Sequence, residues 1–307
     1  MNAPLRGVVP PVVTPFRDDG TVDIASLTGL VNYLIDAGVH GLFALGSTSE
    51  VAYLTDDERD QVLRATVEAA AGRVPVIAGV MDMTTKRVIE QGLRAKELGV
   101  DGLVVTVPFY ALNDESEIAD HFRAVASQTG LPIYAYDVPV RVNRVKLSLP
   151  LLMMLANEGV IAGVKDSSGD DVAFRRLVMA NRDAGSPLAL LTGHELVVDG
   201  CLLMGADGVV PGYGNVDPAG YVALFEAAER GDWEAARAEQ DRLARGFEIV
   251  FAPRGRSGDV TGVGAFKTAM VARGIIPNNV MAFPNRALSE QDAARVSEIV
   301  AANGLSK

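Results

Sequence analysis

One lysine of this chain occupies a position that suits covalent chemistry. Lys165 closes an apolar run, residues 159–164, that has the composition of a buried strand, and a polar loop follows it. A buried amine is held more readily in its neutral form, and a neutral amine attacks a carbonyl to form a Schiff base. The alternative is a structural lysine that reaches the surface or pairs with Asp166. We expect only Lys165 to be taken out of water; the other lysines lie in helical or polar patterns or at the chain end, and are Lys86, Lys96, Lys146, Lys267 and Lys307.

A glycine turn with two hydroxyl side chains follows the second predicted strand. Residues 46–50 read Gly-Ser-Thr-Ser-Glu. The hydroxyl groups of Ser47 and Thr48, together with the backbone N–H groups of such a turn, suit a small carboxylate. An ordinary strand-to-helix turn is the alternative interpretation.

Polar side chains also follow the fifth and seventh predicted strands. Tyr136 ends the strand beside the one that carries Lys165, so its phenol can reach the amine or a bound substrate and transfer a proton. Arg141, close behind, is a candidate clamp for a second substrate carboxylate. The simpler alternatives are a packing role for the tyrosine and a surface charge for the arginine. The seventh strand ends at Thr192, and Glu195 follows, so both are candidates for contacting substrate.

These groups together favour 2-oxo-acid chemistry. The amine would condense with the keto group, and the protonated imine would then act as an electron sink for making or breaking a carbon–carbon bond. This chemistry requires neither a metal nor an organic cofactor, so we expect the covalent imine on Lys165 to suffice. The three histidines have no partner cysteine and no zinc-like spacing; they are His40, His121 and His194.

The composition narrows the class of protein. The formal net charge of −11 argues against a nucleic-acid or anionic-membrane surface. Hydrophobic residues make up 49% of the chain, which is enough for one large core. No secretory signal pattern begins the sequence, and the single cysteine, Cys201, excludes an intrachain disulfide. We expect a cytoplasmic protein with no membrane or nucleic-acid partner.

The spacing of apolar residues predicts eight strands, each followed by a helix. The strands are expected at residues 8–13, 41–45, 74–80, 102–106, 132–136, 160–165, 188–191 and 208–210. The helices are expected at residues 24–37, 57–71, 85–98, 117–128, 150–157, 172–182, 196–204 and 218–230. Continuously apolar strands that alternate with helices indicate a parallel sheet, and eight such units indicate a (β/α)8 TIM barrel. An open doubly wound sheet is the alternative, but its G-x-G-x-x-G signature does not follow the first strand.

The rest of the chain is predicted to form a C-terminal helical extension, with helices at residues 233–251, 262–273 and 289–302. No Gly/Ser linker separates it from the barrel. We therefore expect a barrel over residues 1–230 and an extension over residues 231–307, packed together as a single structural unit.

Over essentially its whole length, the chain resembles the class I aldolase family of dihydrodipicolinate synthase and N-acetylneuraminate lyase. The matching segments are residues 46–50, 136–139, 163–167 and 205–208. The resemblance implies that Lys165 forms the Schiff base with pyruvate or a pyruvate-derived 2-oxo acid. It also implies that Tyr136 relays protons, aided by Ser47 and by Tyr110 from a neighbouring subunit. Ser47 and Thr48 would hold the pyruvyl carboxylate, Val210 would line the pocket, and the protein would be a homotetramer built as a dimer of dimers.

Some positions depart from the family pattern. Ser49 replaces a usual glycine, Asp137 replaces a common asparagine, and Met83 stands where lysine-inhibited synthases place a polar residue. Arg141 is shared with the synthases, where it holds the carboxylate of the aldehyde, whereas Glu195 lies near the strand where sugar-acid aldolases contact hydroxyl groups.

We therefore expect a Schiff-base lyase that acts on pyruvate or a 2-oxo acid with an aldehyde partner. Its reaction would be carbon–carbon cleavage or formation, or dehydration, of a 2-keto-3-deoxy sugar acid or related oxo acid. The alternatives are a dihydrodipicolinate synthase that condenses pyruvate with aspartate semialdehyde, and a non-catalytic oxo-acid-binding barrel.

Overall fold

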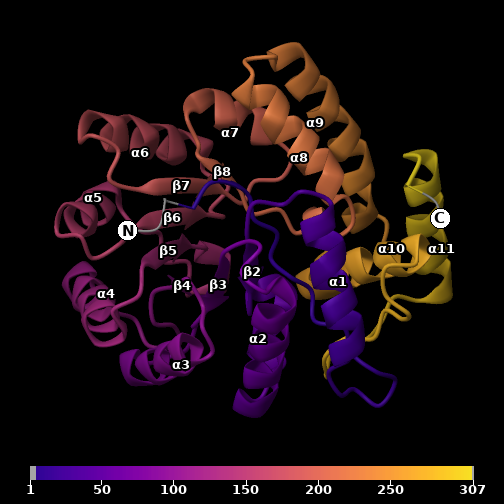
Figure 1. Ribbon diagram of the computed structural model, residues 1–307, viewed down its shortest axis with the longest axis horizontal. Coiled ribbons are helices and arrows are strands. Elements are labelled where there is room, and N and C mark those ends of the chain that lie inside the picture. Colours follow the sequence, from indigo (N-terminus) through magenta and orange to yellow (C-terminus); the bar gives the residue numbers. More distant parts are fainter. Residues whose placement is uncertain (1–4, 306–307) are drawn as a thin grey trace.

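Eight parallel strands form the centre of the molecule, whose computed structural model describes residues 5–305 (Figure 1). Their hydrogen-bonded order is β1-β8-β7-β6-β5-β4-β3-β2. A parallel bridge between Pro11 and Phe43 joins the segment after β1 to β2, so the ring closes. The strands are β1 (Gly7–Val8), β2 (Leu42–Ala44), β3 (Val76–Gly79), β4 (Gly102–Val105), β5 (Ile133–Asp137), β6 (Gly163–Asp166), β7 (Ala189–Thr192) and β8 (Gly208–Val209).

Helices surround the strands, and three more lie to one side (Figure 1). The surrounding helices are α1 (Ile24–Asp36), α2 (Asp56–Ala70), α3 (Thr85–Glu97), α4 (Glu115–Thr129), α5 (Leu149–Asn157), α6 (Asp171–Asp183), α7 (Val198–Met204) and α8 (Pro218–Glu229). The additional helices are α9 (Trp233–Phe247), α10 (Ala265–Arg273) and α11 (Glu290–Ala302). The predicted TIM barrel with C-terminal helices is confirmed.

The first strand is shorter than predicted, and prolines explain the difference. Pro10 and Pro11 have no N–H to donate, so a regular ladder cannot continue through them. The neighbouring groups still pair, since Val12 N donates to Phe43 O at 2.9 Å and Phe43 N donates to Pro10 O at 3.0 Å. The segment therefore completes the ring without forming a long strand.

The extension differs from the prediction in its helix ends. The helix predicted at residues 233–251 ends as a short 3₁₀ segment, Glu248–Phe251, and a π-helical turn, Val260–Gly264, precedes α10. Helix α9 packs on α8, and α10 packs on α11. The division of the chain at residue 230 stays a prediction.

Side chains of the strands alternate between the barrel interior and the layer beneath the helices. The interior cluster includes Phe43, Tyr136, Leu191 and Val210. Leu190, beside Leu191 on the same strand, belongs to the larger cluster that the helices cover. This alternation decides which polar residues at the strand ends face the interior.

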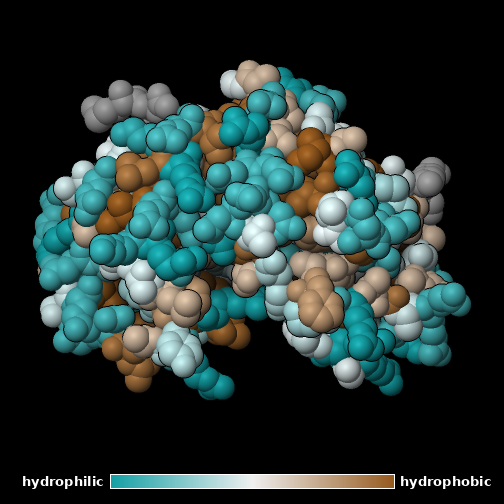
Figure 2. Space-filling model, turned by 90° about the horizontal axis from the view of Figure 1, so that it is seen from below, coloured by the Kyte–Doolittle hydropathy of each residue, from teal (hydrophilic) through white to brown (hydrophobic). Residues whose placement is uncertain are grey.

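Polar side chains cover most of the face shown in Figure 2, where apolar side chains are exposed in small separate groups. Within residues 5–305, no helix combines the length and the apolar character needed to cross a membrane. The first four residues, where the sequence predicts no secretory signal, and Lys307 lie outside the described residues.

A second lysine is completely buried, which the sequence did not predict. Lys267, on α10, is 0% exposed and donates to Glu50 Oε1 at 2.5 Å and to Val280 O at 2.8 Å. Glu50 Oε2 accepts the backbone N–H of Ala282 at 2.8 Å. Burial lowers the pKa of Lys267, and the carboxylate of Glu50 opposes this effect. The expectation that only Lys165 leaves water is therefore wrong, because a helix on the extension closes over the turn after β2.

Replacing Lys267 with methionine should destabilise the fold, because the Glu50 carboxylate would remain buried without its counter-charge. We expect a loss of about 3–5 kcal/mol in the free energy of unfolding, measured by urea denaturation. The double variant Glu50→Gln/Lys267→Met should recover part of this loss. Lys86→Met, at an exposed position, is the matched control. A Lys267→Met protein as stable as the control would show that the buried pair contributes nothing.

Candidate active site

Lys165 lies inside the barrel near the carboxyl end of β6, which is where TIM-barrel enzymes carry their active sites. It is 6% exposed. Its backbone is in register with that of Tyr136 on β5, and its Nζ lies 4.1 Å from the centre of the Tyr136 ring. The same Nζ lies 4.9 Å from the centre of the Phe43 ring. The amine is thus held between two aromatic faces at the barrel mouth.

Tyr136 has an unusual protonation balance. Burial acts to raise the pKa of its hydroxyl, but the neighbouring Lys165 charge and interactions with Ser47, Lys165 and Ser167 outweigh burial. The net result is a pKa below the ordinary value for tyrosine. A tyrosine with a lowered pKa can accept and return a proton more readily, as a proton relay requires.

A cluster of charges fixes the strand ends behind this pair. Asp137 and Asp166 follow Tyr136 and Lys165, and their side chains alternate to the other side of the sheet. Lys146 contacts both carboxylates, pairing with Asp137 and lying 3.6 Å from Asp166 Oδ2. Asp137, a departure from the family pattern, therefore has a charged partner in this chain.

The turn after β2 is held in an uncommon conformation. Leu45 and Glu50 both have positive φ angles, 57° and 59°. A Cβ atom on Gly79 would lie 2.1 Å from Leu45 O, so only glycine allows β3 to approach this turn. The hydroxyl of Ser49 donates to Val12 O at 2.5 Å. Ser49, although not the usual glycine, thus ties the turn to the segment after β1.

The buried residues of the turn, Ser49 and Glu50, position the half-buried residues Ser47 and Thr48. Ser47 and Thr48 begin the short 3₁₀ helix Ser47–Ser49. Among the described residues, their backbone N–H groups have no backbone acceptor. The hydroxyl of Ser47 faces that of Tyr136, so the turn and the amine border one space.

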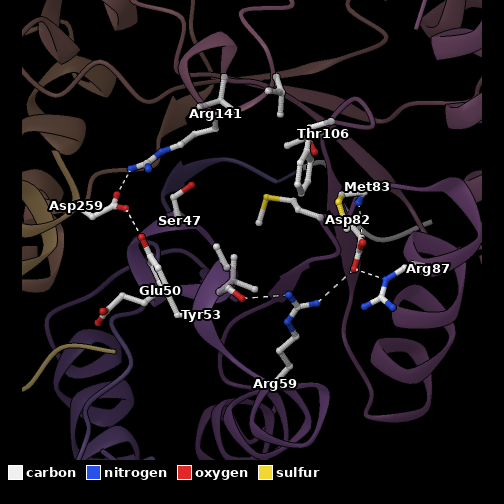
Figure 3. A pocket seen from close by; sticks show the side chains of 16 residues that line it. Ser47, Glu50, Tyr53, Arg59, Asp82, Met83, Arg87, Thr106, Arg141 and Asp259 are labelled. Atoms are coloured by element: carbon white, nitrogen blue, oxygen red, sulfur yellow. Dashed lines mark hydrogen bonds and ion pairs between the residues drawn. The ribbon is translucent and has the colours of Figure 1, made fainter. Parts of the chain in front are cut away.

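A cavity of about 430 Å³ opens above the carboxyl ends of β2 to β5 (Figure 3). One side is bordered by Ser47, Arg141 and Asp259, and Tyr53 lies beside Asp259. The other side carries three charged residues joined by ion pairs, Arg59, Asp82 and Arg87. The cavity is therefore lined by charges of both signs rather than by a single cationic patch.

Arg141 reaches this cavity, but its charge is already paired. Its Nη2 donates to Asp259 Oδ1, and Asp259 Oδ2 accepts the hydroxyl of Tyr53 at 3.0 Å. Burial lowers the pKa of Arg141, but the ion pair with Asp259 outweighs it and raises the pKa above its usual value. Asp259 could not be recognised from the sequence, because it lies in a polar stretch 118 residues from Arg141.

Glu195 lies near the amine but points into its own set of donors. Its Oε1 accepts the N–H of Tyr213 at 2.7 Å and the hydroxyl of Tyr221 at 3.3 Å. Burial raises the pKa of this carboxyl group to about 7, while these hydrogen bonds and the charge of Lys165 act against the increase. Glu195 is therefore close to Lys165 without lining the cavity of Figure 3.

The structure does not bring Thr192 to the cavity. Its hydroxyl accepts the N–H of His194 at 3.0 Å and faces Cys201 of α7. It shares the outward side of β7 with Leu190, two residues earlier. The period of the strand explains why Thr192, unlike Leu191, turns away from the interior.

The remaining candidate residues lie in different environments. Val210 is buried in the interior cluster that contains Tyr136. Tyr110 is 86% exposed and has a φ of 76°, so it projects from the loop after β4 in a conformation that non-glycine residues rarely adopt. Within residues 5–305, no group of three or more histidine, cysteine, aspartate or glutamate side chains gathers as a metal site would require.

Comparison with known proteins places this geometry in a family. Residues 4–303 match the model of the dihydrodipicolinate synthetase family. The chain belongs to this family. It is 37% identical to an uncharacterised DapA-like lyase of Halobacterium salinarum over 98% of this chain and 95% of the relative. It is 36% identical to a 4-hydroxy-tetrahydrodipicolinate synthase of Phenylobacterium zucineum over 80% and 82% of the two chains.

Solved structures of the family have the same fold. The YagE protein of E. coli K12, crystallised with pyruvate, matches with a TM-score of 0.92 and 29% identity over 99% of this chain and all of that one (100%). A dihydrodipicolinate synthase of Bacteroides thetaiotaomicron matches with a TM-score of 0.92 and 28% identity over 98% of this chain and 100% of that one. The protein is thus a lyase of the Schiff-base-forming, class I aldolase type, as expected, and the alternative of a non-catalytic barrel is set aside.

Replacing Glu195 with glutamine should change how stability depends on pH. In the folded protein the pKa of the Glu195 carboxyl group is raised from 4.5 to about 7. The protonated group therefore contributes its full stabilisation below pH 4.5, and this contribution is lost as pH rises through about 7. Glutamine stays neutral and keeps an acceptor for Tyr213. At about pH 8 the variant should therefore be more stable than the unmodified protein by up to about 3 kcal/mol.

Urea denaturation of both proteins across this pH range measures the difference. Glu248→Gln, which removes one exposed carboxylate from the extension, controls for net charge. A stability difference between Glu195→Gln and the unmodified protein that is constant with pH would contradict the raised pKa.

Proposed function

We propose that the protein acts on pyruvate or a 2-oxo acid through an imine on Lys165, with an aldehyde as the second reactant. The observation that supports this proposal best is the pairing of Lys165 with Tyr136 in register at the barrel mouth. An amine beside a phenol of lowered pKa can form the imine and exchange the protons that the reaction requires.

In the cleavage direction, the amine of Lys165 adds to C2 of the substrate, and loss of water gives the protonated imine. Tyr136, as phenolate, removes the proton of the C4 hydroxyl while the C3–C4 bond breaks. The electron pair of that bond moves into the imine to give an enamine, and the aldehyde leaves. Protonation of C3 and hydrolysis of the imine then release pyruvate and return Lys165 to its free form.

The turn after β2 supplies the carboxylate site in this proposal. The backbone N–H groups of Ser47 and Thr48, which have no backbone acceptor among the described residues, would hold the C1 carboxylate beside the amine together with the hydroxyl groups of both residues. Val210, which belongs to the interior cluster with Tyr136, would pack against the pyruvyl methyl or methylene group. No further cofactor enters the proposed reaction.

Tyr110 would complete the site of a neighbouring subunit. Two other apolar side chains of the loops after β4 and β5 are exposed, Leu112 (79%) and Val140 (80%), and a hydrogen bond from Asn143 Nδ2 to Ala111 O at 3.3 Å joins these loops. Exposed apolar side chains of this kind favour association. We therefore propose a homotetramer in which Tyr110 assists the proton relay of its partner.

The proposed substrate is a 2-keto-3-deoxy sugar acid or a related oxo acid, cleaved, formed or dehydrated. The mixed charges of the cavity and the pairing of Arg141 favour this choice. The second candidate is condensation of pyruvate with aspartate semialdehyde, which the names of several relatives and the position of Arg141 support. Thr192 stays a candidate contact from the sequence alone.

Mixing the protein with pyruvate and borohydride should leave one reduced pyruvyl group on Lys165, detected by intact mass and peptide mapping. Lys165→Ala should lose this adduct and the activity, because no lysine within residues 5–305 that could replace it lines the cavity. Lys86→Ala, at an exposed position, should label as the unmodified protein does. An adduct that persists in Lys165→Ala would contradict the proposed role.

Replacing Tyr136 with phenylalanine should slow turnover while imine formation persists. The ring beside Lys165 is kept, but the proton relay is lost, so kcat should fall about 10²–10⁴-fold with little change in KM. Tyr134→Phe is the matched control, since Tyr134 is a buried tyrosine on the same strand, at the opposite end of the barrel. Equal kcat values for the two variants would rule out the relay.

A further inference from the structure

We propose that Asp259 determines the class of aldehyde that the site accepts, so that it favours an uncharged, hydroxylated chain and excludes one that ends in a carboxylate. This inference deepens the proposed function and rests on it. Asp259 lies on the cavity wall and contacts both Arg141 and Tyr53 (Figure 3).

The pairing of Arg141 with Asp259 is the reason for expecting that the site excludes a carboxylate. An unpaired guanidinium at this rim would bind a carboxylate through two parallel hydrogen bonds. Asp259 already pairs with one nitrogen of this guanidinium and balances its charge, and the Asp259 side chain is only 18% exposed. A carboxylate that approached the remaining N–H groups of Arg141 would face the carboxylate of Asp259 in a partly buried space. Like charges brought together in this way oppose binding.

The carboxylate of Asp259 can accept hydrogen bonds from the hydroxyl groups of a substrate. A hydroxyl both donates and accepts hydrogen bonds, and an ionised carboxylate has about four acceptor positions. Asp259 uses two of its oxygen lone pairs for Arg141 and Tyr53, so acceptor capacity remains. The guanidinium of Arg141, whose side chain is 44% exposed, retains N–H groups for donation. A polyhydroxylated chain can therefore pair with both residues without adding a charge.

Asp259 can be changed without removing a structural contact of its helix. It precedes the π-helical turn Val260–Gly264, and its side chain makes no capping hydrogen bond there. The flanking glycine, Gly258, has open space around it. An Asp259→Asn variant should therefore keep the fold and change mainly the charge opposite Arg141.

Two probes of equal chain length separate the charge from other effects. 2-Oxohexanoate and 2-oxoadipate both form an imine, but only the second ends in a carboxylate. The measured quantity is the concentration of each probe that gives half-maximal borohydride labelling of Lys165. It requires no turnover and no knowledge of the natural aldehyde.

The unmodified protein should require more 2-oxoadipate than 2-oxohexanoate for half-maximal labelling. Asp259→Asn should shift the ratio of the two concentrations about tenfold or more toward 2-oxoadipate, because Arg141 becomes free to bind the carboxylate. The same variant should require severalfold more 2-keto-3-deoxygluconate. Glu248→Gln, which removes an exposed charge elsewhere on the extension, should leave every ratio unchanged.

The outcomes separate this inference from the proposed function. One outcome is that pyruvate labels both proteins while the ratio of the 2-oxoadipate and 2-oxohexanoate concentrations is the same in the unmodified protein and in Asp259→Asn. That result would overturn the role of Asp259 and leave the imine chemistry intact. An equal shift in Glu248→Gln would also overturn it, since the effect would then be one of net charge. No labelling of the folded, unmodified protein by pyruvate or any probe would overturn both.

Discussion

The ion pair between Lys267 and Glu50 is the contact on which the geometry of the site depends. It joins residues 217 positions apart, and both side chains are buried, with exposed fractions of 0% and 1%. Glu50 ends the turn that carries Ser47 and Thr48, and it adopts a positive φ that a non-glycine residue keeps only when its surroundings enforce it. Because removing either partner leaves a charge buried, the extension and the turn are coupled. The C-terminal helices therefore do more than cover the barrel, since they hold the proposed carboxylate site in place.

The amine of Lys165 is controlled by a different means. Parallel strands bring Tyr136 and Lys165 into register, and the alternation of side chains points both into the interior. Aspartates at the next position of each strand point outward, where Lys146 pairs with them. Two neighbouring residues on each strand thus serve opposite purposes: one places a reactive group among aromatic rings, and the other fixes the strand ends with charges. The period of two of a β-strand is what keeps the two sets apart.

The rim of the cavity adds residues from several loops to the pair of Lys165 and Tyr136. Loops after several strands and one residue of the extension meet there, as is usual where TIM barrels carry their specificity. In the proposed function, imine formation needs only the amine, the phenol and a carboxylate site, whereas the choice of aldehyde is proposed to depend on the charges around Arg141. A single aspartate from the extension would then alter the class of substrate without disturbing the covalent step. Such a separation would allow one family chemistry to serve different substrates on one fold.

The sequence by itself determined the barrel and the centre of the site, because both depend on local patterns. Apolar strands alternating with amphipathic helices specify the (β/α)8 fold, and strands in parallel register place Tyr136 beside Lys165. Only the tertiary structure decided which lysine besides Lys165 is buried, which side of β7 carries Thr192, and that Asp259 meets Arg141 across 118 residues. The physical reason is that burial and ion pairing depend on contacts between segments distant in the chain, and a sequence pattern reports only on neighbours within one turn or strand.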